Sequence, residues 1–128
     1  MHLELIGHGP PLVLIHGWAM HSGVFAPLIE RLSAHHALHL VDLPGHGYSI
    51  ERDDIDLARA AARIAQRVPP APWLGWSLGG QIALQAAIEQ PDRVQGLIAI
   101  ASSPRFVRGA DWPQAVSPET FQQFADEL

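Results

Sequence analysis

The sequence contains no cysteine among its 128 residues. Without thiols it can form neither a disulfide framework nor a thiolate metal site. No apolar run approaches the roughly 20 residues that a helix needs to cross a bilayer. The opening residues, Met1-His2-Leu3-Glu4, lack the basic and apolar regions of a secretory signal. These absences predict a cytoplasmic protein that does not enter a membrane.

Basic charge is also scarce. Eight Lys and Arg residues stand against 13 Asp and Glu residues, and the formal net charge is −5. Because non-specific nucleic-acid binding requires positive charge, we expect no nucleic-acid partner. Histidine is abundant, but His35, His36 and His39 span a predicted helix end and strand start, with no thiol or carboxylate at ligand spacing. We therefore expect these histidines to be solvated loop residues, and we expect no metal and no cofactor.

The remaining composition suits one globular domain, with 48% hydrophobic residues available for a core. Continuous apolar runs predict strands that are buried on both faces, and apolar residues at helical spacing separate these runs. The predicted strands cover 11–15, 37–41, 72–74 and 96–101, with a short leading strand over 3–6, and the predicted helices cover 24–32, 57–68 and 78–90. This alternation predicts an α/β fold with a mainly parallel sheet and flanking helices.

One serine stands between glycines at a predicted strand-to-helix corner, in the stretch Gly75-Trp76-Ser77-Leu78-Gly79-Gly80. A sharp turn there would expose the Ser77 hydroxyl at the carboxyl end of the sheet, where ligands bind in this class of fold. Glycine at 75 and 79 gives such a turn the room it needs. We predict Ser77 as a catalytic nucleophile. The alternative is a glycine-rich turn whose serine merely caps the helix that follows.

A serine nucleophile needs hydrogen-bond donors for the oxyanion that forms when it attacks a carbonyl. One expected donor is the backbone N–H of Leu78, directly after the serine, and the other is that of Trp18, in the loop after the strand 11–15. Gly17 would let that backbone come close. We expect His16 to shape the loop by hydrogen bonding rather than to act as the base. The Trp18 ring is expected to line a pocket, although a simple core aromatic is the alternative.

These residues resemble the α/β-hydrolase superfamily and, within it, the family of methyl ester esterases that act on pimeloyl-acyl carrier protein in biotin synthesis. The matching segments are residues 14–18, 38–47, 73–80, 91–94, 101–104 and 111–113. The resemblance implies an α/β-hydrolase core over residues 1–103 and the start of a helical cap over 104–128. It implies Ser77 as nucleophile, Trp18 and Leu78 at the substrate carbonyl, a methyl ester carried on acyl carrier protein as substrate, and a monomeric whole enzyme.

The sequence departs from the family in one respect. The family's catalytic triad runs serine, acid, histidine along the chain, whereas all eight histidines of this sequence precede Ser77. We therefore expect a chain that is truncated at the start of the cap, inactive by itself, and open along the apolar edge of its strand 96–101. A general carboxylesterase, another serine α/β-hydrolase and a non-catalytic fragment or acyl-binding module remain as alternatives.

Overall fold

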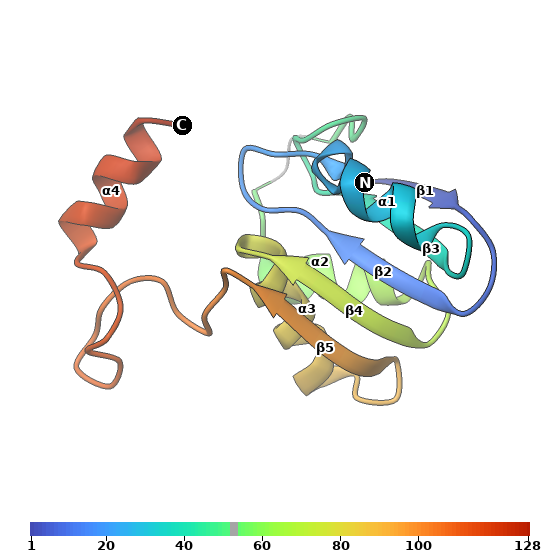
Figure 1. Ribbon diagram of the computed structural model, residues 1–128. Helices are drawn as coiled ribbons and strands as arrows, with labels where there is room; N and C mark the ends of the chain where they lie inside the picture. The colour runs from blue at the N-terminus through green and yellow to red at the C-terminus, as the bar shows by residue number, and fades with distance from the viewer. Residues whose placement is uncertain (52–53) are drawn as a thin grey trace.

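A five-stranded sheet forms the centre of the molecule (Figure 1). The computed structural model describes residues 1–51 and 54–128. The strands lie in the order β1-β3-β2-β4-β5, and neighbours pair in parallel except for β1, which runs antiparallel to β3. Their bounds are β1 (His2–Ile6), β2 (Pro11–Ile15), β3 (Ala37–Asp42), β4 (Ala71–Trp76) and β5 (Val94–Ile100). The predicted α/β fold with a mainly parallel sheet is confirmed.

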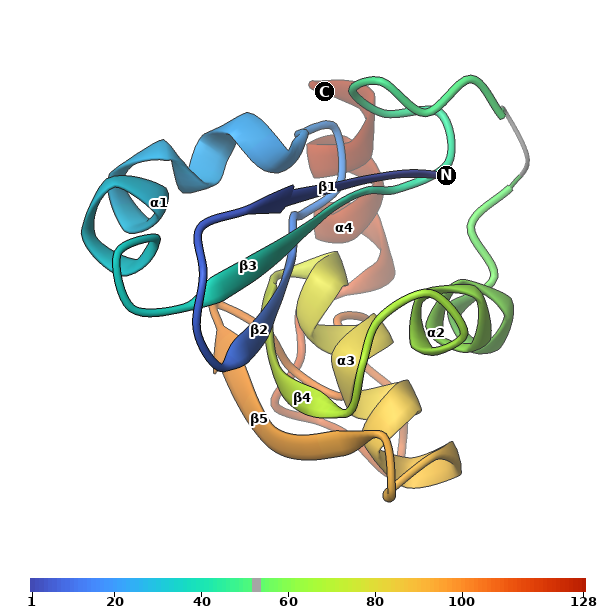
Figure 2. The ribbon, with the colours of Figure 1, turned by 90° about the vertical axis from the view of Figure 1, so that its right-hand side faces the viewer.

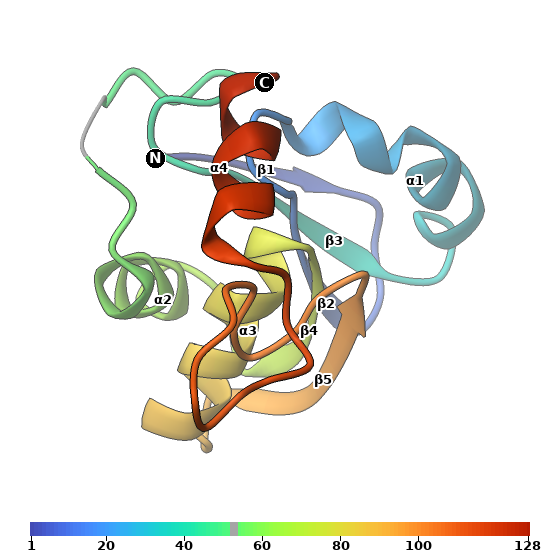
Figure 3. The same ribbon diagram turned by 90° about the vertical axis from the view of Figure 1, so that its left-hand side faces the viewer.

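Helices cover both faces of this sheet. They are the 3-10 helix η1 (Ser22–Phe25), α1 (Ala26–Leu32), α2 (Leu57–Ala65), α3 (Leu78–Glu89) and α4 (Pro118–Asp126). Figure 2 shows α1 on one face and α2 with α3 on the other. The last helix, α4, lies beyond the end of the sheet and is joined to β5 by a long loop (Figures 1 and 3). None of the helices formed by the described residues has the length and apolar character to cross a membrane.

Side-chain alternation along the strands divides the interior into two cores. On β2, Val13 and Ile15 pack with residues of α2 and α3, whereas Leu12 and Leu14 pack on the face that α1 covers. Successive side chains of a strand point to opposite faces, so a strand covered on both sides is apolar throughout. The apolar run at 11–15 therefore predicted β2 with the correct bounds.

Two predicted helices differ from the observed ones by more than one residue at an end. Residues 22–25 form the 3-10 helix, and α1 begins only at Ala26, with Pro27 in its first turn, where a missing N–H costs no hydrogen bond. The predicted helix 57–68 is too long, because α2 ends at Ala65. Residues 66–68 turn toward the Pro69-Pro70 pair, since a residue before proline is pushed out of helical geometry.

The connections of β2 and β4 locate the crevice of the sheet. These strands are neighbours, but the chain leaves β2 toward β3 and leaves β4 toward β5, on opposite sides. Such a switch of direction opens a crevice outside the carboxyl ends of the two strands, where α/β proteins bind ligands. The loop 16–18 follows β2 and Ser77 follows β4, so the two predicted parts of the site flank this crevice.

The strand β5 forms an open edge of the sheet. Its side chains Leu97, Ile98 and Ile100 are 39%, 46% and 41% exposed. This confirms the predicted exposed apolar edge. Such an edge is a template for pairing with further strands.

Candidate active site

Ser77 occupies a strained turn between β4 and α3. Its backbone has φ 52° and ψ −116°, a conformation that a side-chain-bearing residue rarely adopts. Its N–H donates to the carbonyl of Ile100 at 2.9 Å. Ser77 stands at the N-cap position of α3, yet its hydroxyl makes no capping hydrogen bond. The alternative of a serine that merely caps the helix is therefore wrong, and the hydroxyl faces a cavity instead.

Glycines bring three backbone segments together around this turn. A Cβ atom at Gly75 would collide with the backbone of Gly79, and one at Gly79 would collide with the carbonyl of Ile15 on β2. A Cβ atom at Gly17 would lie 3.2 Å from the Cβ of Ser77. At these positions there is no room for a side chain between the Ser77 turn and β2, the loop after β2 and α3. This confirms the predicted need for glycine at 75 and 79.

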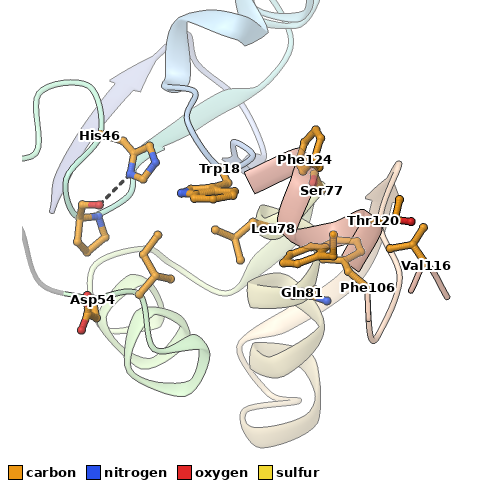
Figure 4. Close-up of a pocket in the computed structure, with 13 residues that line it drawn as sticks. Trp18, His46, Asp54, Ser77, Leu78, Gln81, Phe106, Val116, Thr120 and Phe124 are labelled. Carbon is orange, nitrogen blue, oxygen red and sulfur yellow. Dashed lines mark hydrogen bonds between the residues drawn. The ribbon is translucent and has the colours of Figure 1, made fainter. Parts of the chain in front are cut away.

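A cavity of about 750 Å³ lies above Ser77. Figure 4 shows Trp18, Ser77 and Leu78 around this space, together with Phe106 and Phe124 of the C-terminal segment. The full lining is Trp18, Pro44, His46, Asp54, Ile55, Ser77, Leu78, Gln81, Phe106, Val116, Thr120, Phe121 and Phe124. Trp18 is 40% exposed and lines this space, so the alternative of a buried core aromatic is wrong. The lining is mainly apolar and suits an acyl chain.

The two expected oxyanion donors come from the two segments that meet at Ser77, the start of α3 and the loop after β2. Leu78 is the first residue of α3, so its N–H has no acceptor within the helix and stands at the positive end of the helix dipole. The loop that carries Trp18 is held by two hydrogen bonds, from the Met20 N–H to the Gly17 carbonyl at 3.3 Å and from the Ala19 N–H to His46 Nε2 at 3.1 Å. This arrangement fits the stabilisation of negative charge on a carbonyl oxygen beside Ser77.

His16 is fully buried, and both of its ring nitrogens are occupied. Nε2 accepts a hydrogen bond from the Leu43 N–H at 3.0 Å, so the ring proton must sit on Nδ1, which donates to the Gly17 carbonyl at 2.7 Å. Burial lowers the pKa of His16 and so favours the neutral ring over the protonated one. His16 therefore shapes the loop, as the sequence predicted, and has no free nitrogen to accept a proton from Ser77.

His46 is a lining residue that sequence reasoning missed. Its Nε2 accepts from the Ala19 N–H, and its Nδ1 donates to the Pro44 carbonyl at 2.8 Å, the dashed bond of Figure 4. Among the described lining residues, His46 and Asp54 are the titratable ones. With both imidazole nitrogens of His46 engaged, the described lining offers no free imidazole base to Ser77. The sequence did offer a way to predict His46. It lies in the loop Pro44-Gly45-His46-Gly47 that follows β3, and β3 ends at the same edge of the sheet as β2 and β4.

The aromatic wall formed by Phe106, Phe121 and Phe124 was not predicted either. Phe121 and Phe124 lie on α4, and the start of this helix can be predicted from the sequence. The Ser117 hydroxyl accepts from the Thr120 N–H at 3.2 Å, and Pro118 follows in the first turn. The position of α4 over the cavity, in contrast, depends on contacts distant in sequence. Across residues 1–51 and 54–128, no three His, Asp or Glu side chains gather in an arrangement that could hold a metal ion.

Comparison with known families agrees with this geometry. Residues 10–127 match the family model of the alpha/beta hydrolase fold. The chain belongs to the α/β-hydrolase family. A curated relative from Xanthomonas oryzae pv. oryzae (strain MAFF 311018), named pimeloyl-[acyl-carrier protein] methyl ester esterase, is 62% identical over 131 aligned positions, which cover 100% of this chain and 51% of the relative. A relative of the same name from Xylella fastidiosa (strain 9a5c) is 58% identical and is covered to 50%. The chain thus spans about half the length of the curated relatives it matches.

Solved structures share the fold. An esterase from Exiguobacterium antarcticum is similar at a TM-score of 0.86 and 25% identity, over 98% of this chain and 50% of that one. The N-acyl homoserine lactonase AidH, solved with N-butanoyl homoserine, is similar at a TM-score of 0.72 and 26% identity, over 85% of this chain and 46% of that one.

Proposed function

We propose that the whole protein carrying this sequence is a serine carboxylesterase that hydrolyses the methyl ester of pimeloyl-acyl carrier protein in biotin synthesis, with Ser77 as nucleophile. The observation that carries the proposal is the strained turn that presents an uncapped Ser77 hydroxyl to an apolar cavity. The names of relatives that are about 60% identical support the substrate.

The proposed reaction begins when Ser77 Oγ bonds to the ester carbonyl carbon and gives its proton to a base. Negative charge then develops on the carbonyl oxygen, which accepts hydrogen bonds from the backbone N–H groups of Leu78 and Trp18. The intermediate breaks its bond to the methoxy group, which takes the proton and leaves as methanol. Water then cleaves the acyl-serine ester, releases the carboxylic acid and restores the hydroxyl. No cofactor is needed.

The base and its acid partner belong, in this proposal, to the part of the relatives' length that this chain does not span. No histidine follows Ser77 in this sequence, and the imidazole nitrogens of His16 and His46 are occupied. We assign residues 1–103 to the hydrolase core and 104–128 to the start of a cap, because Phe106, Phe121 and Phe124 cover the cavity from that segment. We place the whole protein in the cytoplasm, as a monomer.

The test uses a chimaera in which residues 1–128 replace the matching half of the Xanthomonas oryzae relative. The chimaera should release methanol from pimeloyl-acyl-carrier-protein methyl ester, and Ser77→Ala should lower kcat about a thousandfold or more. Ser103→Ala, which alters a neighbouring hydroxyl that does not touch Ser77, should change little. A Ser77→Ala variant that kept more than about a tenth of the rate would overturn the nucleophile assignment.

The substrate assignment has its own test. The chimaera should restore growth without biotin to a bacterial strain that lacks this esterase. A soluble chimaera that cleaves simple methyl esters but does not restore growth would instead identify a general carboxylesterase.

A further inference from the structure

The end of β5 holds Ser77 from both sides. The Ile100 carbonyl accepts the Ser77 N–H at 2.9 Å, and the Ser102 hydroxyl donates to the Ser77 carbonyl at 2.8 Å. Between them, Ala101 has φ 46°, a left-handed conformation that is costly for alanine. Both segments joined by these two hydrogen bonds therefore contain a strained residue, Ser77 in one and Ala101 in the other.

Gly80 gives a second, independent sign that this contact matters. A Gly-x-Ser-x-Gly turn needs glycine only at 75 and 79, and Gly80 is additional. A Cβ atom at Gly80 would collide with the side chain of Ser102, and it would lie 3.2 Å from the Gly75 carbonyl oxygen. Gly80 lies inside α3, where glycine is less favourable than alanine. Its lack of a side chain leaves the space that Ser102 occupies.

We propose that Ser102 is a positioning residue that aims the Leu78 N–H at the oxyanion. This inference rests on the proposed function of Ser77. The Ser77 carbonyl and the Leu78 N–H belong to one planar peptide unit, so fixing the direction of the carbonyl fixes that of the N–H. The other donors to this carbonyl, the N–H groups of Gly80 at 2.9 Å and Gln81 at 3.4 Å, belong to α3 itself. Ser102 ties the peptide to the sheet, and its hydrogen bond also polarises the peptide so that the N–H donates more strongly.

The kinetic test compares two adjacent serines in the chimaera. Ser102→Ala should lower kcat about tenfold, less than the loss of an entire oxyanion donor, while KM stays within about twofold. Ser103→Ala is the matched control, because the Ser103 hydroxyl contacts the backbone of Arg105 and not Ser77. Ser102→Thr, which keeps the hydroxyl, should recover most of the rate. Equal kinetics for Ser102→Ala and Ser103→Ala would overturn the proposal.

A pair of inhibitors separates positioning from a merely structural role. A trifluoromethyl ketone forms a tetrahedral adduct with an oxyanion on Ser77, whereas the plain methyl ketone of the same chain binds without forming it. Ser102→Ala should weaken the first by the same factor of about ten that kcat loses and leave the second unchanged. Equal weakening of both ligands would mean that Ser102 only supports the shape of the pocket, and would refute the proposal.

A substitution at Gly80 keeps the proposal testable if Ser102→Ala does not fold. Gly80→Ala raises helix propensity but pushes the Ser102 side chain from its place, so kcat should fall about as far as in Ser102→Ala. Unchanged kcat in a folded Gly80→Ala variant would count against the proposal. Failure of the proposed function is distinguishable, because it would appear as activity in Ser77→Ala whatever Ser102 does.

Discussion

The Leu43 N–H donates to His16 Nε2 at 3.0 Å and so joins the ends of β3 and β2 through a buried imidazole. Protonation of Nε2 would remove the acceptor and place a positive charge in the core. The burial that lowers the pKa of His16 is opposed in part by its hydrogen bond to the Gly17 carbonyl. The loop that carries the proposed oxyanion donor therefore keeps its shape only while this ring is neutral.

The free energy of unfolding should consequently fall as the pH drops below about 6.5, the ordinary pKa of histidine. The folded-state pKa of His16 is lowered, so the unfolded chain binds more protons in this range and gains stability relative to the folded state. Urea unfolding of the chimaera at several pH values would measure the slope. His16→Gln should flatten it between about pH 7 and pH 5, and an unchanged slope would contradict the assignment.

Asp42 should be a second stabilising group. Its buried carboxylate accepts from the Ser22 N–H at 2.7 Å and the Tyr48 N–H at 2.9 Å. Burial raises its pKa, but these hydrogen bonds outweigh that effect and lower it overall. Its contribution is therefore present above the unfolded pKa of about 4 and is lost as the pH falls through the folded one.

Replacing Asp42 by alanine should cost about 2–4 kcal/mol of unfolding free energy, since the buried N–H of Ser22 and the partly buried N–H of Tyr48 lose a charged acceptor. Asp56→Ala is a suitable control. Its carboxylate also accepts a backbone N–H, that of Arg59 at 2.7 Å, but at an exposed helix start, so the loss should be about 1 kcal/mol. Equal losses in the two variants, measured by urea unfolding of the chimaera, would contradict the buried role of Asp42.

The close approach of α3 to β2 predicts a large difference between two glycine substitutions. Gly79→Ala would drive a Cβ atom into the Ile15 carbonyl and should destabilise the protein by about 3 kcal/mol or prevent folding. Gly96→Ala, on β5, meets nothing closer than Pro72 Cβ at 3.8 Å and should be neutral within about 0.5 kcal/mol. Thermal unfolding of both variants tests this, and a tolerated Gly79→Ala would show that the observed approach is not required.

The 128-residue chain expressed alone should associate through β5, whose Leu97, Ile98 and Ile100 are exposed and whose outer edge is open. Ile98→Glu should reduce the association seen by light scattering, because it places a charge in that edge. Ile88→Glu alters an exposed isoleucine on α3, away from the edge, and should have less effect. Equal behaviour of the two variants, or a monomeric unmodified chain, would refute the edge as the cause.

The same isolated chain should react little with a fluorophosphonate probe. Ser77 is un-ionised at neutral pH and needs a base. His46 of the described lining and His16 of the supporting loop are already hydrogen-bonded at both ring nitrogens. Strong stoichiometric labelling would show that a base acts within this chain, and a His46→Ala variant would then test the first candidate.

Sequence reasoning was most successful where one local rule decides the outcome. The apolar run at 11–15 and the glycines at 75 and 79 each encode a single constraint, burial on two faces or a close backbone approach, and the structure has both. It was less successful at the end of α2. Helical periodicity continues past Ala65, but the prolines at 69 and 70 disfavour helical geometry in the residues before them, so the helix ends earlier.

The lining of the cavity was harder to predict. His46 and the phenylalanines of residues 106–124 come to Ser77 only through the order of the strands and the path of the chain after β5. Ser102 was hidden for the same reason, because its partner is a carbonyl far away in sequence. Periodicity and spacing describe neighbours along the chain, and these contacts join segments that the sheet brings together.

The placement of two tryptophans gives the molecule a pair of internal optical probes. Trp73 is completely buried beneath α2 and α3, and within the described part of the chain its indole N–H has no partner, so its fluorescence should be blue-shifted in the folded state and should report loss of the core. Trp18 borders the cavity and is partly in water, so its emission should respond when an acyl chain displaces that water. A variant with phenylalanine in place of Trp73, Trp76 and Trp112 would leave Trp18 as the one tryptophan of residues 1–128 and would allow ligand entry to be followed without a label.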